Sequence, residues 1–265
     1  MLVDTHCHLN MPPLGDDPVG VLARAAAAGV GRVVVPAYDS ASWNPILALA
    51  AEHAGVHPAL GLHPWVAVDE WVAAARTSGM GGIKDHLSRA VASSSTPVVA
   101  IGEIGLDTKI DTPDLPRQRD VLAVQLELAA DLDLPVILHC RGAFDDLLAA
   151  LERHGGRLRG VCHAYSRGIE LAERIVGAGL HLGLGGAATR DRARLHKALP
   201  KLLLEKIVLE TDAPSIGLQD VPPEQTEPRH VRDIAAAIAE VRGTTIATIA
   251  EVTTANANAL FHLPV

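Results

Sequence analysis

Six side chains that commonly bind metal ions follow short apolar runs at widely separated points of the chain. They are His6 and His8 in VDTHCH, Glu103 in VVAIGE, His139 in LPVILH, His163 in GVCH and Asp212 in KIVLETD. The apolar runs are rich in β-branched and aliphatic residues, which is typical of buried strands, and helix-like stretches separate them. Imidazoles and carboxylates at the ends of many strands predict a metal site assembled from distant parts of the chain.

One common fold brings the carboxyl ends of many strands to one place. In a (β/α)8 barrel the active site lies at the mouth formed by the carboxyl ends of eight parallel strands. A chain of 265 residues allows about 33 residues for each unit of one strand, one helix and two short loops. We therefore expect an α/β protein with a single (β/α)8 TIM-barrel domain over residues 1–265.

The alternation of apolar runs and helical stretches predicts the boundaries of these units. The expected strands are 2–6, 32–36, 57–62, 97–101, 135–138, 160–162, 181–184 and 206–209. The expected helices are 17–28, 42–53, 116–131, 144–154, 169–178, 192–199, 227–242 and 245–261, with two more helical stretches in 66–96 separated by Gly79, Gly81 and Gly82. The irregular segments 108–116 and 214–228 follow candidate ligands, so we expect them to be loops at the mouth.

Composition limits the classes of partner. Hydrophobic residues make up 48% of the chain and aromatic residues only 3%, which fits a parallel sheet covered by Ala-rich helices. The net charge of −8 argues against an extended nucleic-acid surface, although bound cations can supply local positive charge for one or two phosphates. We expect no membrane partner, because charges interrupt every apolar run before about 18 residues. We also expect a monomer or a weak oligomer.

The cysteines and the N-terminus predict a cytoplasmic location. Cys7, Cys140 and Cys162 are an odd number of thiols in a mid-sized chain, which argues against a disulfide framework and for a reducing compartment. All three adjoin candidate histidines, and strand alternation turns them away from the barrel axis as small buried thiols. The first residues do not have the basic and apolar regions of a signal peptide.

Each candidate ligand also has a structural interpretation. His6 and His8 lie two residues apart in a strand, so both rings point the same way and can chelate one ion, and Asp4 is in phase to orient an imidazole. Glu103 is either a ligand or a helix-capping or salt-bridge acid. His139 and His163 are either ligands or core histidines bonded to the backbone.

Taken together, four imidazoles and two carboxylates are more ligands than one ion needs. They predict two divalent ions with Glu103 between them. A two-metal site activates a shared hydroxide and stabilises the entering and leaving oxygens of a displacement, so phosphate-ester hydrolysis is the reaction class that suits it best. Asp212 is the acid expected to accept a proton from the nucleophilic water.

The chain resembles the TatD family of metal-dependent deoxyribonucleases, within the amidohydrolase-like barrels. The matching segments are DTHCH at 4–8, ALGLHP at 59–64, IGEIGLD at 101–107, LPVILHCR at 134–141, CHAYS at 162–166, LETDAP at 209–214 and NANALF at 256–261. They span nearly the whole chain in the family's order. MPPLGDDP at 11–18 most resembles the YjjV-type branch of the family.

The resemblance implies a ligand set for each ion. The first ion would be held by His6, His8, Glu103 and Asp212, and the second by Glu103, His139 and His163. Family members are treated as magnesium-dependent phosphodiesterases acting on DNA ends. Imidazole-rich sites generally prefer zinc, manganese or another transition ion, so the resemblance leaves Mg, Zn and Mn open.

The resemblance also implies contacts with the substrate. His63, in GLHP, matches a family histidine near the scissile phosphate, where it would protonate the leaving oxygen or stabilise charge; its structural alternative is capping the turn before Pro64. Arg141 shares a face with His139 and would bind a phosphate oxygen, or else form a structural salt bridge. Ser166 is a further candidate for contact with phosphate.

Two departures from the family pattern bear on the substrate. The family commonly has a basic loop ending in Asn-Glu-Pro or Asn-Arg-Pro after LETDAP, whereas this chain has PPEQTEP with Thr226 at the Asn position. An aromatic residue often follows GLD in the family, and here Thr108 follows it. We therefore expect a two-metal phosphodiesterase acting on DNA ends, with a metallohydrolase of a small-molecule amide, lactone or phosphoester as the alternative.

Overall fold

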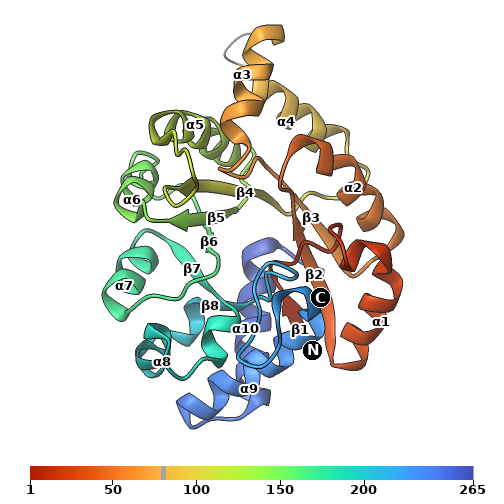
Figure 1. Cartoon of the computed structure of the whole chain (residues 1–265), viewed down its shortest axis with the longest axis vertical. Coiled ribbons are helices and arrows are strands. Elements are labelled where there is room, and N and C mark those ends of the chain that lie inside the picture. The colour runs from red at the N-terminus through yellow and green to blue at the C-terminus, as the bar shows by residue number, and fades with distance from the viewer. Residues whose placement is uncertain (79–81, 265) are drawn as a thin grey trace. The chain divides into compact units, whose positions relative to one another are not determined.

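The strands follow one another around a single eight-stranded sheet in the order β1-β2-β3-β4-β5-β6-β7-β8 (Figure 1). The computed structural model describes residues 1–78 and 82–264. The strands are β1 Leu2–Asp4, β2 Val30–Pro36, β3 Val56–Leu60, β4 Ala100–Asp107, β5 Val136–Arg141, β6 Gly160–Cys162, β7 Leu180–Leu184 and β8 Ile207–Leu209. The registered pairs β1–β2, β3–β4, β4–β5 and β7–β8 are parallel. The predicted (β/α)8 TIM-barrel class is confirmed.

Helices connect the strands nearly as the sequence pattern predicts. They are α1 Pro18–Ala27, α2 Trp43–Glu52, α3 Ala67–Ser78, α4 Gly82–Ser93, α5 Leu115–Asp131, α6 Phe144–Glu152, α7 Ile169–Gly177, α8 Arg194–Ala198, α9 Val231–Arg242 and α10 Ile246–Phe261. Two helices follow β3, as expected; of the glycines predicted to separate them, Gly79 and Gly81 lie outside the described residues and Gly82 begins α4. Among the described helices, none is both long and apolar enough to cross a membrane.

The backbone divides into two compact units. The first comprises residues Met1–Val35, Gly55–His57 and Cys162–Val265, and the second comprises Pro36–Ala54 and Pro58–Val161. The prediction that residues 1–265 form a single domain stays a prediction. Each unit contains part of the candidate ligand set, so each is described separately below.

In the first unit, the chain after β1 lies beside the chain after β8. The backbone N of Thr5 donates to the carbonyl of Leu209 at 2.9 Å, and Cys7 forms a parallel bridge with Ala213. Helix α10 packs against both strands. Because of this pairing, the segment containing His6 and His8 runs alongside the segment containing Asp212.

In the second unit, β4 is longer than the sequence pattern predicts. The expected strand ended at Ile101, so that Glu103 followed it, but β4 continues to Asp107 and pairs with β5 in a register that places Gly105 opposite His139. The predicted end of this strand was therefore wrong, because the apolar run VVAI ends at Ile101 while the strand continues beyond it. A side chain at Gly105 would place its Cβ 1.9 Å from the carbonyl oxygen of His139, so glycine is what permits this close pairing.

Helix α5 supports this part of the sheet and lies along β4 (Figure 1). Two of its glutamines, Gln118 and Gln125, are almost fully buried among apolar residues. The three cysteines are free thiols; Cys7 and Cys162 are buried as predicted, whereas Cys140 is only half-buried.

Candidate metal centre

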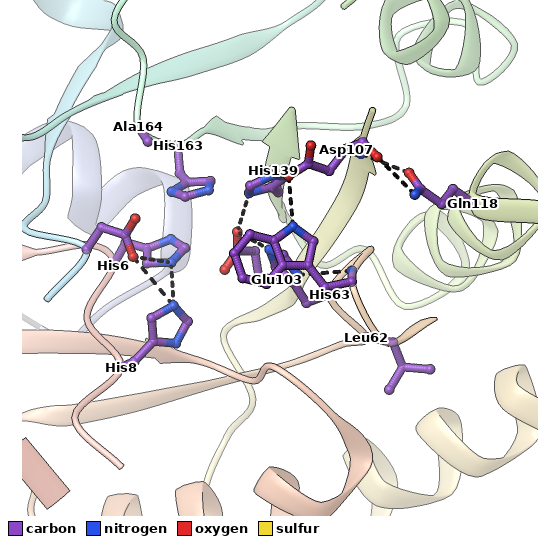
Figure 2. Close-up of polar contacts among 12 residues, drawn as sticks. His6, His8, Leu62, His63, Glu103, Asp107, Gln118, His139, His163 and Ala164 are labelled. Atoms are coloured by element: carbon purple, nitrogen blue, oxygen red, sulfur yellow. Dashed lines mark hydrogen bonds and ion pairs between the residues drawn. The ribbon is translucent and has the colours of Figure 1, made fainter. Parts of the chain in front are cut away.

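The first unit gathers two imidazoles and a carboxylate around one point; Figure 2 shows the two imidazoles, His6 and His8. Nε2 of His6 lies 3.3 Å from Nε2 of His8, and Oδ1 of Asp212 lies 3.6 and 3.5 Å from these two nitrogens. Two ligand atoms bound to one ion at tetrahedral angles lie about 3.4 Å apart when each bond is near 2.1 Å. The donor atoms therefore have both the chemistry and the spacing that a bound divalent ion requires.

Asp4 fixes the backbone beneath this cluster. Its carboxylate accepts hydrogen bonds from the backbone N of His6 at 3.2 Å, the backbone N of Thr211 at 2.9 Å and the hydroxyl of Thr211 at 2.6 Å. The sequence pattern predicted that Asp4 would orient an imidazole ring, but in the structure it holds the main chain. Burial is the main cause that raises the pKa of Asp4 to about 7, although the bonds from Thr211 oppose the rise.

Asp212 is held in a backbone conformation that few residues adopt. Its φ of 52° lies in the left-handed region, which Asp tolerates better than most residues with a Cβ. Burial raises the pKa of its carboxyl, but the hydrogen bond from His8 and the positive charges of His6 and His163 outweigh burial, and the net shift is downward. The carboxylate is therefore ionised at neutral pH.

His163 belongs to the same group of side chains. Its ring stacks on that of His6, with centroids 4.2 Å apart and planes 15° from parallel, and the ligand atoms of His6, His163 and Asp212 all lie within 4.8 Å of one another. The resemblance placed His163 with Glu103 and His139. Within the first unit, His163 lies beside His6 and Asp212, and its assignment to an ion with Glu103 and His139 stays a prediction.

Glu210 is a buried acid that the sequence pattern missed. It accepts a hydrogen bond from the backbone N of Ala164, and its Oε1 lies 3.8 Å from Nδ1 of His163. Burial, as the leading cause, raises the pKa of Glu210 to about 8. Its place two residues before Asp212 in LETD puts it in phase with a candidate ligand, which was the available signal.

The second unit has its own ligand cluster, centred on Glu103 (Figure 2). Oε1 of Glu103 lies 3.0 Å from Nδ1 of His139 and 3.3 Å from Nε2 of His63. Glu103 is 2% exposed, and a carboxylate buried to this degree needs positive charge or hydrogen-bond donors nearby. Like the cluster of the first unit, this one has the donor types that divalent metal ions bind.

His139 lies between two carboxylates, which limits its protonation state. Its Nδ1 faces Glu103, and its Nε2 lies 3.1 Å from Oδ2 of Asp107. A neutral imidazole has one N–H, so if it donates to Asp107 its remaining lone pair faces the Glu103 oxygen. Either a second ring proton or a metal ion must then separate these two electron-pair donors. The arrangement matches the carboxylate–histidine–metal chains that orient metal ligands in proteins.

Asp107 is the most important residue that the sequence pattern missed. It accepts hydrogen bonds from Nε1 of Trp65 at 2.8 Å and from the backbone N of Lys109 at 2.7 Å, in addition to its contact with His139. Burial raises the pKa of Asp107, but the hydrogen bonds from His139, Trp65 and Lys109 have the larger opposite effect. The net result is a pKa lowered to about 2. Asp107 ends the motif IGEIGLD and is in phase with Glu103, so its spacing alone could have identified it.

Two glutamines of α5 fix the backbone that carries these side chains. Oε1 and Nε2 of Gln118 bond the backbone N and O of Asp107 at 2.8 and 3.0 Å (Figure 2). Gln125 makes the corresponding bonds to the N and O of Leu62, at 2.8 and 3.3 Å. Because Leu62 directly precedes His63, one helix positions both His63 and Asp107.

His63 belongs to the cluster centred on Glu103, and its tautomer also suits it to donate a proton. Its Nδ1 accepts a hydrogen bond from the backbone N of Trp65 at 3.2 Å, so the neutral ring carries its proton on Nε2, which faces Glu103. Its ring also stacks on Tyr38, with centroids 5.2 Å apart. In this tautomer Nε2 has no lone pair to offer an ion.

The two remaining candidates lie at strand ends and are exposed. Arg141 ends β5, where its carbonyl accepts a hydrogen bond from the backbone N of Thr108 at 2.9 Å. Ser166 follows β6 in the first unit. Their exposure leaves both side chains accessible to a substrate.

Comparison with known proteins agrees with the fold. The family model described as "TatD related DNase" matches residues 3–262. The chain is 37% identical over 263 residues to the uncharacterized metal-dependent hydrolase YjjV of Escherichia coli K12, covering 99% of this chain and 98% of that protein. The crystal structure of the YjjV TatD homolog from E. coli K12 superposes with a TM-score of 0.89 at 36% identity, over 99% of this chain and 98% of that one.

A more distant similarity carries a described activity. The chain is 35% identical over 173 residues to the 3'-5' ssDNA/RNA exonuclease TatD of E. coli K12, which is 63% of this chain and 66% of that protein. A (β/α)8 barrel with these buried imidazole and carboxylate sets defines a metal-dependent hydrolase. The chain belongs to the TatD family of such hydrolases.

Proposed function

We propose that this protein is a two-metal phosphodiesterase that acts on the ends of nucleic acids, with DNA as the first candidate. The observation that carries the proposal is the presence, in each unit, of buried imidazole and carboxylate atoms at the spacing of metal ligands. The exonuclease activity of the E. coli TatD relative supports a phosphodiester as the bond that is cleaved. A cytoplasmic, monomeric or weakly oligomeric protein remains part of the proposal.

The proposed ligands follow the family resemblance. His6, His8, Glu103 and Asp212 would hold the first ion, and Glu103, His139 and His163 the second, with Glu103 shared. The carboxyl ends of barrel strands meet at one mouth, which is the general reason to expect one centre from both sets. Bound divalent ions would supply an acidified water and neutralise charge on the phosphate. Imidazole-rich coordination favours Zn or Mn over Mg.

Four side chains would handle protons and phosphate oxygens. Asp212 is ionised at neutral pH, so it can orient the attacking water and take its proton. His63 carries its proton on Nε2 in the neutral ring, so it can donate to the leaving oxygen. Arg141 and Ser166, both exposed, would contact the phosphate.

The charge distribution favours one alternative, a hydrolase of a small-molecule amide, lactone or phosphoester. The chain carries a net charge of −8. In the loop after β8, Thr226 is buried with its hydroxyl donating to the carbonyl of Pro222, and Glu227 accepts a hydrogen bond from Arg24. A loop that is acidic and bonded to its own unit gives little attraction to a polyanion.

A metal-series assay tests the proposal. The purified protein, stripped of metal and reloaded with Mg, Mn or Zn, is incubated with end-labelled single-stranded DNA and with a panel of small esters, lactones and amides. We expect metal-dependent loss of terminal nucleotides, which Glu103→Ala abolishes and which Glu152→Ala, a change at an exposed acid of α6, leaves intact. Turnover of the small panel without DNA cleavage would favour the alternative, and full activity of Glu103→Ala would exclude the bridging role.

A further inference from the structure

Trp65 exposes an indole ring beside the proposed proton donor. Aromatic residues are scarce in this chain, with three Trp, two Tyr and two Phe in 265 residues. Trp43 is 3% exposed and serves the core, whereas Trp65 is 50% exposed. Its ring lies 5.1 Å from that of His63 at an interplanar angle of 88°.

The exposed ring is held in one orientation. Its Nε1 donates to Oδ2 of Asp107 at 2.8 Å, and Asp107 is a buried acid that is itself held by contacts with His139 and Gln118. The backbone N of Trp65 bonds to Nδ1 of His63, and the indole lies nearly perpendicular to the ring of Tyr38, with ring centroids 6.5 Å apart. A ligand that stacks on a ring already fixed in this way loses little conformational entropy from the protein.

Core packing does not account for this arrangement. Half of the indole remains in water, although burying an aromatic ring is among the most favourable contributions to a core. The hydrogen bond to Asp107 instead holds the ring at the surface, next to a residue of the candidate centre. Fixed, exposed aromatic faces of this kind are what single-stranded nucleic acids and free nucleotides use for base stacking.

We propose that Trp65, with Tyr38 behind it, is a stacking platform for a nucleobase adjacent to the scissile phosphate. The residue after Asp107 is Thr108, which has no ring and whose hydroxyl bonds to the carbonyl of Arg141. Trp65 bonds to Asp107, the neighbour of Thr108, so the loop after β3 provides the planar surface that the loop after β4 lacks. The substrate class is therefore a base-bearing nucleotide ester rather than an aliphatic phosphoester. This inference rests on the proposed phosphodiesterase function.

A substrate pair that differs only in the base tests the platform. One single-stranded oligonucleotide has ordinary terminal nucleotides, and the other has abasic nucleotides at both ends. We expect the wild type to prefer the first by about tenfold to a hundredfold in kcat/KM, the range that one stacked base provides. Trp65→Leu should bring this ratio close to one by raising the KM for the oligonucleotide with ordinary ends. Trp65→Phe, which keeps a ring, should retain most of the preference. Equal turnover of both oligonucleotides by the wild type would overturn the inference.

A binding measurement separates this inference from the proposed function. Adenosine 5'-monophosphate and ribose 5-phosphate are titrated against the intrinsic fluorescence of the wild type and of Trp65→Phe, which also serves as the absorbance control. We expect saturable quenching of the wild type by the nucleotide alone, and a much smaller signal from the variant. That result supports the platform even if no phosphodiester is cleaved. An equal response of both proteins to the nucleotide would reject the platform even if the nuclease activity is real.

Discussion

Nε2 of His139 lies 3.1 Å from Oδ2 of Asp107, so the candidate ligand is oriented by an acid four residues beyond Glu103 on the same strand. Asp107→Asn keeps the shape of this side chain but removes its negative charge. We expect metal affinity at the second unit to fall about tenfold to a hundredfold, the usual effect of losing such an outer partner. Calorimetric titration with Zn or Mn measures it.

The control for this change is Asp111→Asn, at an exposed acid of the next loop. It should leave the metal affinity unchanged. Unaltered affinity in Asp107→Asn would mean that Asp107 serves Trp65 and the backbone rather than His139.

Gly105 should be intolerant of any side chain. Its φ of 151° disfavours other residues, and a Cβ would lie 1.9 Å from the backbone oxygen of His139. We expect Gly105→Ala to reduce the free energy of unfolding by at least about 3 kcal/mol, because the β4–β5 pairing must shift. Urea denaturation with intrinsic fluorescence measures the loss.

Gly155→Ala separates the clash from the backbone strain. Gly155 has a φ of 58°, but a Cβ there would meet nothing within 4 Å. It should cost only about 1–2 kcal/mol, the penalty of the left-handed conformation alone. Similar losses in both variants would show that steric contact with His139 is not the cause.

His57 should make stability depend on pH. Burial, with a smaller contribution from Arg32, lowers the pKa of His57 from 6.5 to about 4 in the folded protein. The folded protein therefore keeps this ring neutral, whereas the unfolded chain protonates it more readily. The free energy of unfolding is unaffected by this group above about pH 6.5 and decreases as the pH falls from 6.5 towards 4. Partial solvation of the ring reduces the expected loss to about 1–2 kcal/mol.

His57→Leu should remove this component of the pH dependence. Within the described residues, Nε2 of His57 has no hydrogen-bond partner, so replacing it with an apolar side chain leaves no donor or acceptor unsatisfied. Thermal unfolding of the wild type and variant from pH 7 to pH 4 gives the difference. His86→Gln, at an exposed residue of α4, is the matched control. A constant difference in Tm across this range would contradict the shift.

The ends of several strands were predictable because residues that commonly bind metal ions directly follow the apolar runs of those strands. His6, His163 and Asp212 each follow an apolar run, and within the first unit their ligand atoms lie close together. The extent of β4 was not predictable, because the close pairing at Gly105 depends on the β5 backbone opposite it.

The supporting residues were harder to predict for a different reason. Gln118 and Gln125 lie in an amphipathic helix, where a glutamine is usually solvated, and only the three-dimensional pairing shows that they clamp Asp107 and Leu62. Trp65 was equally ambiguous, since one tryptophan after a His-Pro turn fits either the core or the surface. In the structure Trp65 lies at the surface, where its hydrogen bond to Asp107 holds the ring.

Removing ligands from one unit at a time should remove ions one at a time. His8→Ala takes away a nitrogen that lies 3.3 Å from His6 and 3.5 Å from Asp212, and His139→Ala takes away the ring next to Glu103. If the wild type holds two ions per chain, we expect each variant to hold about one and the double variant almost none. Elemental analysis after dialysis against a metal-free buffer gives the count, with His86→Ala as the control.

Chelation should then lower the Tm of the wild type but not that of the double variant. An ion present at a hundred times its Kd stabilises the folded state by about 2.7 kcal/mol, which is large enough to measure. Since each ion binds mainly to the folded ligand set, the loss of Tm should scale with the number of ions removed. A double variant that keeps the metal content of the wild type would show that these histidines are core residues and that the ions bind elsewhere.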